Sequence, residues 1–214
     1  EPLPEAPLPL PNDAPHLLER LAAEQPGQRI QTSVRQALQR QTQALVNRYA
    51  REYSSNHIHN LAAIVADVET GEVLAYAGNA TYPADERRGN QVDIITSPRS
   101  TGSILKPFLY AGMLHDGLLL PSMLVSDVPL NINGFSPHNY NKTFYGAVPA
   151  HVAIERSLNV PLVRMLSQYN TGRFMSLLKS WGMTTLRFSE EHYGASLILG
   201  GAEGTLWRSE ERRV

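Results

Sequence analysis

Two short apolar segments joined by a tight turn constrain the fold of this chain more than any other feature of its sequence. Residues 61–67 (LAAIVAD) and residues 73–77 (VLAYA) are apolar runs of strand length that include β-branched side chains. The connection between them is short and contains Gly71, so the two predicted strands form an antiparallel hairpin. An isolated hairpin is marginally stable in water, and this one therefore needs helices packed on it.

Two helices are predicted before the hairpin. The first starts at about residue 16 and is closed by a Pro-Gly pair. The second opens with a capping-box pattern, Ser33 followed by Gln36, and its apolar side chains recur at helical spacing to about Glu52. Between the two helices, residues 29–32 alternate like a short strand.

A largely helical block is predicted after the hairpin. One helix runs from near Ser103 to about His115, and a turn-rich stretch follows at residues 121–149. A helix, a hairpin and then a helical block predict an α+β fold, in which helices pack against an antiparallel sheet. The last helical segments are expected near residues 149–158, 161–168 and 171–181.

The composition excludes several classes of protein. The formal net charge is -1, so the chain lacks the basic footprint of a nucleic-acid binder, and we expect no nucleic acid partner. No apolar run approaches the roughly 20 residues that a membrane-spanning helix needs. The absence of cysteine excludes disulfides, thiolate metal sites and a cysteine nucleophile. No helical histidine pair with a matching acid is present, and we expect no metal or cofactor.

The pattern Ser-x-x-Lys, which can pair a nucleophile with a proton acceptor, occurs twice. Ser176 and Lys179 lie inside an amphipathic helical pattern, and we interpret them as part of a solvated helix face. Ser103 and Lys106 differ, because Pro107 fits a helix only within the first turn and so places the helix start close to Ser103.

Ser103 and Lys106 are therefore predicted on one helical face, with the serine at the positive end of the helix. A lysine that is neutralised by desolvation or nearby cations can accept a serine proton, and N–H groups at the helix start can stabilise an oxyanion. On this local pattern alone an alternative stays open, in which Ser103 caps the helix and Lys106 is solvated.

Ser157 and Asn159 form a second candidate pair. They follow a helical run and precede Pro161, which disfavours helix at Val160, so we predict them on a short connection between two helices. A hydroxyl and an amide on such a corner could relay a proton and bind a substrate peptide group. Helix capping is the alternative function of these side chains.

Together these segments resemble the transpeptidase domain of the class A, bifunctional penicillin-binding proteins, a family with S-x-x-K, S-x-N and K-T-G motifs. The text PRSTGSILKPF at residues 98–108 resembles the first motif and its surroundings, and IERSLNVPLV at residues 154–163 resembles the second. The resemblance runs from about residue 13 to Trp207, and three further segments follow in the family's order, at residues 29–39, 64–79 and 136–148.

The resemblance implies a β-lactamase/transpeptidase-like fold and a serine-type DD-transpeptidase, an acyltransferase that cross-links peptidoglycan stem peptides and is the target of β-lactam antibiotics. Ser103 would be the nucleophile and Lys106 its proton acceptor. Ser157 would shuttle protons toward the leaving group, and Asn159 would hold the substrate amide. The resemblance also implies a periplasmic location, an inner-membrane anchor outside this sequence, and other cell-wall synthesis proteins as partners.

The family's third motif is absent from these 214 residues, because Thr-Gly never follows a lysine. In the family the K-T-G strand lies downstream of S-x-N, so we expect a domain that is incomplete at its C-terminus and an impaired activity. Two alternatives stay open: an inactive truncated remnant or binding module without catalysis, and a β-lactamase-like serine hydrolase. We expect a proline-rich linker at residues 1–15, a partial transpeptidase domain at residues 16–207 and an atypical charged tail at residues 208–214.

Overall fold

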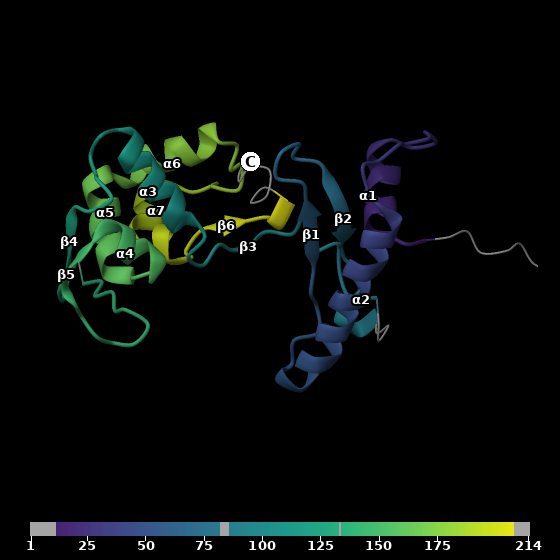
Figure 1. Ribbon diagram of the computed structural model, residues 1–214, viewed down its shortest axis with the longest axis horizontal. Helices are drawn as coiled ribbons and strands as arrows, with labels where there is room; N and C mark the ends of the chain where they lie inside the picture. The colour runs from purple at the N-terminus through teal and green to yellow at the C-terminus, as the bar shows by residue number, and fades with distance from the viewer. Residues whose placement is uncertain (1–11, 82–85, 133, 208–214) are drawn as a thin grey trace, which may run out of the picture. The chain divides into compact units, whose positions relative to one another are not determined.

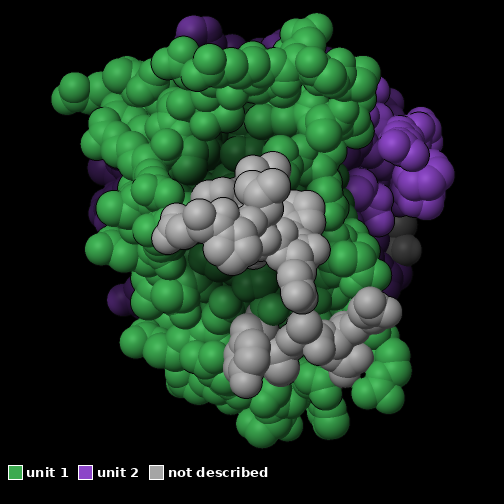
Figure 2. Space-filling model, turned by 90° about the vertical axis from the view of Figure 1, so that its right-hand side faces the viewer, with its two compact units in different colours: residues 1–97, 205–214 green, residues 98–204 purple. Residues whose placement is uncertain are grey.

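The computed structural model describes residues 12–81, 86–132 and 134–207, and the chain divides into two compact units (Figure 1). Unit 1 combines residues 1–97 with residues 205–214, and unit 2 comprises residues 98–204 (Figure 2). Most of the expected linker and all of the expected charged tail lie outside the described residues.

Unit 1 contains two helices packed on the predicted hairpin (Figure 1). Its strands pair antiparallel with Val65 opposite Ala75, so the predicted hairpin is confirmed. A small apolar core forms where the second helix packs on the second strand, from Val46, Ala50, Ala77 and Ala80. The elements are α1 (Pro15–Glu24), α2 (Gln36–Glu52), η1 (Tyr53–Asn56), β1 (Ala63–Ala66), β2 (Val73–Ala77) and η2 (Glu86–Arg88).

A buried glutamine takes the place of a neighbouring strand along β2. Gln39 Oε1 accepts from the Tyr76 N–H at 2.7 Å, and Gln39 Nε2 donates to the Tyr76 carbonyl at 3.0 Å. One turn earlier the Arg35 N–H donates to the Leu74 carbonyl at 2.9 Å. Because these groups occupy the backbone of β2, the strand predicted at residues 29–32 does not form, and that prediction is wrong.

The predicted capping box at the start of α2 is also wrong. The Ser33 hydroxyl donates to the Val73 carbonyl at 2.8 Å, and the Gln36 amide donates to Asp13 at 2.8 Å. The N-cap residue is Arg35, which makes no side-chain cap. Both polar side chains therefore have partners distant in sequence, which a local pattern does not contain.

Unit 2 is mostly helical, and its predicted helices are present with shifted ends. The turn-rich prediction for residues 121–149 missed one antiparallel hairpin, in which Val125 lies opposite Val148. The elements are β3 (Arg99–Ser100), α3 (Leu105–His115), β4 (Leu124–Asp127), β5 (Gly146–Pro149), α4 (Ala150–Glu155), α5 (Asn159–Tyr169), α6 (Thr171–Ser180), α7 (Glu190–Tyr193), η3 (Gly194–Leu199) and β6 (Glu203–Gly204).

The core of unit 2 forms where α3, α5 and α6 pack together. In α3 the buried side chains recur every fourth residue, at Leu105, Leu109 and Met113, so one face of the helix is buried. Gly112 lets the helices approach closely, because a Cβ there would lie 2.7 Å from Leu177 and 3.1 Å from the Tyr169 hydroxyl. This packing fixes the axis of α3, whose first turn carries Lys106.

Candidate active site

Ser103 lies in the turn that leads into α3, and its side chain is exposed. The helix begins at Leu105, so Pro107 is its third residue, where a missing N–H removes no helical hydrogen bond. Lys106 donates its backbone N–H to the Ser103 carbonyl at 3.2 Å. The proline therefore places the helix start as the sequence predicts, with Ser103 in the turn just before it.

The backbone of residues 200–202 lies against this turn and forms a strap that holds it. The Thr101 N–H donates to the Ala202 carbonyl at 3.0 Å, and the Ser100 hydroxyl donates to the Gly200 carbonyl at 2.7 Å. Gly200 has a φ of 100°, and a Cβ there would lie 2.8 Å from the Gly102 Cα. Only a glycine therefore permits the strap to approach the turn that carries Ser103 so closely.

Lys106 is almost fully buried, with 2% of its surface exposed. Its Nζ donates to the Ser157 carbonyl at 2.7 Å, to the Asn159 Oδ1 at 2.7 Å and to the Ser157 hydroxyl at 3.2 Å. Three acceptors match the three N–H donors of an ammonium group. Lys106 thus connects the Ser-x-x-Lys pattern to the pair Ser157 and Asn159. Lys106 and Ser157 are 51 positions apart in the sequence.

Burial lowers the pKa of the Lys106 ammonium from 10.5 to about 8, because the charged form is desolvated. At pH 7 about a tenth of such lysines are neutral. A neutral amine keeps two N–H donors, enough for the two acceptors at 2.7 Å, and its lone pair can then accept from the Ser157 hydroxyl. Lys106 is therefore able to exchange a proton near neutral pH.

Ser157 occupies the corner between α4 and α5 with a φ of 49°, in the left-handed region that costs a serine about 1 kcal/mol or more. Asn159 is the first residue of α5, and Pro161 is the third. The prediction that Pro161 would keep Val160 out of the helix is wrong, because a first-turn proline needs no N–H partner. The predicted corner is present at residues 156–158, and it contains Ser157 but not Asn159, which the prediction also placed there.

Two further polar residues, which belong to none of the predicted motifs, support this corner. Asn139 Oδ1 accepts from the Asn159 N–H at 2.9 Å, and Asn139 Nδ2 donates to the carboxylate of Asp127 at 2.9 and 3.0 Å. Asp127 is fully buried and Asn139 is 3% exposed. Their spacing in sequence follows no motif, so only a three-dimensional structure brings them together.

The structure gathers Lys106, Ser157 and Asn159, while the Ser103 hydroxyl makes no hydrogen bond to any described residue. Ser176 instead donates its hydroxyl to the Gly172 carbonyl, one turn earlier in α6.

Within the described ranges no group of three or more His, Asp or Glu side chains could hold a metal ion. None of the described helices is both long and apolar enough to cross a membrane.

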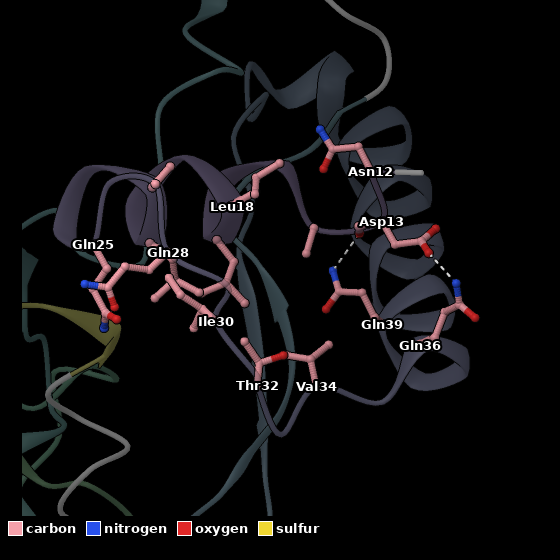
Figure 3. A pocket seen from close by; sticks show the side chains of 15 residues that line it. Asn12, Asp13, Leu18, Gln25, Gln28, Ile30, Thr32, Val34, Gln36 and Gln39 are labelled. Atoms are coloured by element: carbon pink, nitrogen blue, oxygen red, sulfur yellow. Dashed lines mark hydrogen bonds between the residues drawn. The ribbon is translucent and has the colours of Figure 1, made fainter. Parts of the chain in front are cut away.

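A separate groove of about 490 Å³ lies in unit 1, between α1 and the segment that leads into α2 (Figure 3). Leu18, Ile30 and Val34 give it apolar walls, while Asp13 and Gln39 form a polar side. None of the four candidate catalytic residues lines this groove. We therefore do not count it as part of the candidate active site.

Comparison with known proteins assigns the family. Residues 61–201 match the family model described as the penicillin binding protein transpeptidase domain. The chain belongs to the penicillin-binding protein transpeptidase family, which acts in cell-wall synthesis. Its curated relatives are class A proteins, among them penicillin-binding protein 1C from Escherichia coli K12, 33% identical over 206 residues. That match covers 96% of this chain and 26% of the relative.

Further relatives agree with this assignment. Penicillin-binding protein 1A from Rickettsia felis is 28% identical over 156 residues, which cover 70% of this chain and 18% of the relative. The chain thus spans about a quarter or less of the length of these two proteins.

Solved structures share the fold. PonA1 from Mycobacterium tuberculosis superposes with a TM-score of 0.64 at 19% identity, over 90% of this chain and 54% of that chain. A structure of PonA1 in complex with penicillin V gives a TM-score of 0.60, also at 19% identity, over 88% of this chain and 52% of that chain. The predicted α+β, transpeptidase-like fold class is therefore confirmed.

Proposed function

We propose that residues 16–207 carry the acylating machinery of a peptidoglycan DD-transpeptidase, with Ser103 as the nucleophile and Lys106 as its proton acceptor. The observation that carries this proposal is the burial of Lys106 among acceptors from Ser157 and Asn159, three residues after an exposed serine. The family to which the chain belongs supports it.

The proposed reaction begins with attack of the Ser103 Oγ on the carbonyl carbon of a D-Ala-D-Ala stem peptide. As the new C–O bond forms, the hydroxyl proton passes to a neutral Lys106 amine. The C–N bond then breaks, and the proton reaches the leaving amine through the Ser157 hydroxyl, which lies 3.2 Å from Lys106 Nζ. D-Alanine departs. An amine of a neighbouring stem peptide then attacks the ester carbonyl; as the new C–N bond forms, the C–O bond to Ser103 breaks, and the proton of the amine passes through Lys106 to the Ser103 oxygen.

We assign to Asn159 the binding of the substrate amide. In this structure its Oδ1 accepts from Lys106, and its Nδ2 donates to the His138 carbonyl at 2.8 Å. A substrate amide would therefore have to share or replace one of these contacts. An exchange at Oδ1 would couple substrate binding to the hydrogen bonds of Lys106.

β-Lactams are the proposed inhibitors, since a strained cyclic amide presents the same carbonyl to Ser103 and its leaving group stays attached to the acyl-enzyme. The structure of PonA1 with penicillin V supports this ligand class for a protein of the same fold. Peptidoglycan stem peptides and other cell-wall synthesis proteins are the proposed partners, and the periplasm is the proposed location.

The K-T-G motif of the family is not among these 214 residues. We propose that a polypeptide of these 214 residues alone is acylated slowly, because the family binds the substrate carboxylate on the K-T-G strand.

Time-resolved intact-protein mass spectrometry with a fluorescent penicillin tests the proposal. The expected result is a slowly formed, long-lived adduct of one penicillin per chain, which is lost in Ser103→Ala. A Ser176→Ala variant is the matched control, because it removes the serine of the other Ser-x-x-Lys pattern, and it should label like the unmodified chain.

Three results would contradict the proposal in different ways. Prompt stoichiometric labelling would contradict the impairment. Rapid release of hydrolysed penicillin would favour the β-lactamase-like alternative. No adduct on a chain that circular dichroism shows to be folded would favour the inactive remnant.

A further inference from the structure

Asp127, at the end of β4, is a fully buried carboxylate that the proposed reaction does not use. It accepts from the Asn139 amide at 2.9 and 3.0 Å and from the Tyr145 N–H at 2.9 Å. No Lys or Arg in the described part of the chain pairs with it. A buried carboxylate is costly unless such donors satisfy it, so these contacts hold the loop that carries Asn139 in one arrangement.

The orientation of the Asn139 amide follows from this carboxylate. A carboxylate only accepts hydrogen bonds, so Asn139 must turn its Nδ2 toward Asp127, and the same Nδ2 also donates to the Thr143 carbonyl at 2.9 Å. The Oδ1 of Asn139 then faces α5. It accepts from the N–H groups of Asn159 and Val160, at 2.9 and 3.3 Å.

These two N–H groups belong to the first turn of α5, where no carbonyl of the helix can satisfy them. The N-cap residue is Leu158, whose side chain makes no cap. Asn139 therefore caps α5 from a distant segment of the chain. The cap fixes the backbone of Asn159, two residues after Ser157 and its left-handed φ.

The side chain of Asn159 is fixed by the same segment. Its Nδ2 donates to the His138 carbonyl at 2.8 Å, which leaves Oδ1 as the atom that faces Lys106 Nζ at 2.7 Å. The side-chain amides of Asn139 and Asn159 can therefore each point only one way.

We infer that Asp127 and Asn139 are positioning residues, which aim the acceptors of Ser157 and Asn159 at the Lys106 amine. The inference rests on the proposed function, in which Lys106 takes the proton of Ser103. Neither residue contacts the reacting atoms, and each acts through the corner between α4 and α5.

A double-mutant cycle on the acylation rate tests this inference. Asn139→Leu is expected to slow labelling of the folded chain by a fluorescent penicillin at least tenfold. In an Asn159→Ala background the same change is expected to slow labelling by a smaller factor, because Asn159, one of the two residues whose acceptors it positions, has lost its side chain. Asn131→Leu is the matched control. Asn131 caps a turn of the same loop through Gly134 and Ser136, and its loss should change the rate less than twofold.

Asp127→Asn provides a milder variant in case Asn139→Leu does not fold. An amide there can still accept from Asn139 but presents donors to the Tyr145 N–H, so the expected rate lies between those of the unmodified chain and of Asn139→Leu. Equal slowing by Asn139→Leu in both backgrounds, or an unchanged rate in folded Asn139→Leu and Asp127→Asn, would overturn the inference.

A second measurement separates this inference from the proposed function. The chain has three lysines, so 13Cε labelling gives three lysine resonances to follow with pH. Lys106 Nζ donates hydrogen bonds only to uncharged groups of Ser157 and Asn159, and these acceptors stabilise the charged ammonium. Their displacement in Asn139→Leu should therefore shift the Lys106 titration midpoint to lower pH. This shift is expected even in a chain that fails to react with penicillin. An unshifted midpoint would overturn the inference while leaving the proposed function untouched.

Discussion

Lys106 Nζ lies 2.7 Å from the backbone carbonyl of Ser157 and 3.2 Å from the hydroxyl of the same residue. The carbonyl accepts a hydrogen bond at any pH, whereas the hydroxyl can both donate and accept. One residue thus anchors the amine and offers it a partner for proton exchange. Lys106 can therefore change its protonation state without leaving its place, as a proton acceptor beside a serine must.

The rate of penicillin acylation should depend on pH through Lys106. Because only the neutral amine accepts the Ser103 proton, the rate should rise about tenfold per pH unit below pH 7 and level off above about 8, the pKa to which burial lowers this group. Stopped-flow or gel labelling between pH 6 and 10 measures the profile. Lys106→Met should react far more slowly at every pH, and a flat profile in the unmodified chain would contradict the assignment.

Folding stability should depend on the same group. Its pKa is about 8 when folded and 10.5 when unfolded, so between these values the unfolded chain binds more protons. The free energy of unfolding should therefore increase as pH rises from 8 to 10.5, by at most about 3 kcal/mol. Urea titrations of the unmodified chain and of Lys106→Met isolate this contribution, since other titrating groups are common to both. An identical pH dependence in the two proteins would rule it out.

The strap beside the nucleophile depends on Gly200. Gly200→Ala should lower the free energy of unfolding by about 2 kcal/mol more than Gly117→Ala, because a Cβ at residue 200 would lie 2.8 Å from the Gly102 Cα. Gly117 is the matched control, since it has a φ of 70° but no atom within 4 Å of its virtual Cβ. Urea denaturation compares the two. Equal losses would show that only the positive φ matters at Gly200.

Gln39 should contribute strongly to the stability of unit 1. Gln39→Leu leaves the buried N–H and carbonyl of Tyr76 without their partners, and should cost about 3 kcal/mol. Gln41→Leu changes an exposed glutamine of the same helix and should cost less than about 0.5 kcal/mol. Hydrogen exchange at the Tyr76 amide provides a local readout, which should accelerate only in Gln39→Leu.

The hairpin and the helices could be predicted because their signals are local. Apolar runs predicted the strands that form at residues 63–66 and 73–77, and apolar side chains at helical spacing predicted α2 and α6. The β4–β5 hairpin was missed because nearly 20 residues of loop separate its strands and obscure their pairing. The strand predicted at residues 29–32 failed because the side chain of Gln39 in α2 takes its place along β2.

For the candidate site, the residue types were accessible from sequence and the geometry was not. Pro107 fixed the start of α3, so Ser103 and Lys106 could be placed near one another. The contact of Lys106 with Ser157 joins residues 51 positions apart, and it follows from the packing of α3 against α5. Asn139 lies in the family-like segment at residues 136–148, but its role could not be predicted, since it depends on a buried carboxylate twelve residues earlier.

Peptide mapping of the penicillin adduct tests whether Ser103 is the nucleophile and Lys106 its proton acceptor. After long incubation with penicillin and proteolysis, tandem mass spectrometry locates the modified residue. We expect a penicilloyl ester on Ser103, formed slowly, and greatly reduced in Lys106→Met under conditions where that variant is folded. An adduct on any other residue, or undiminished labelling of Ser103 in Lys106→Met, would contradict it.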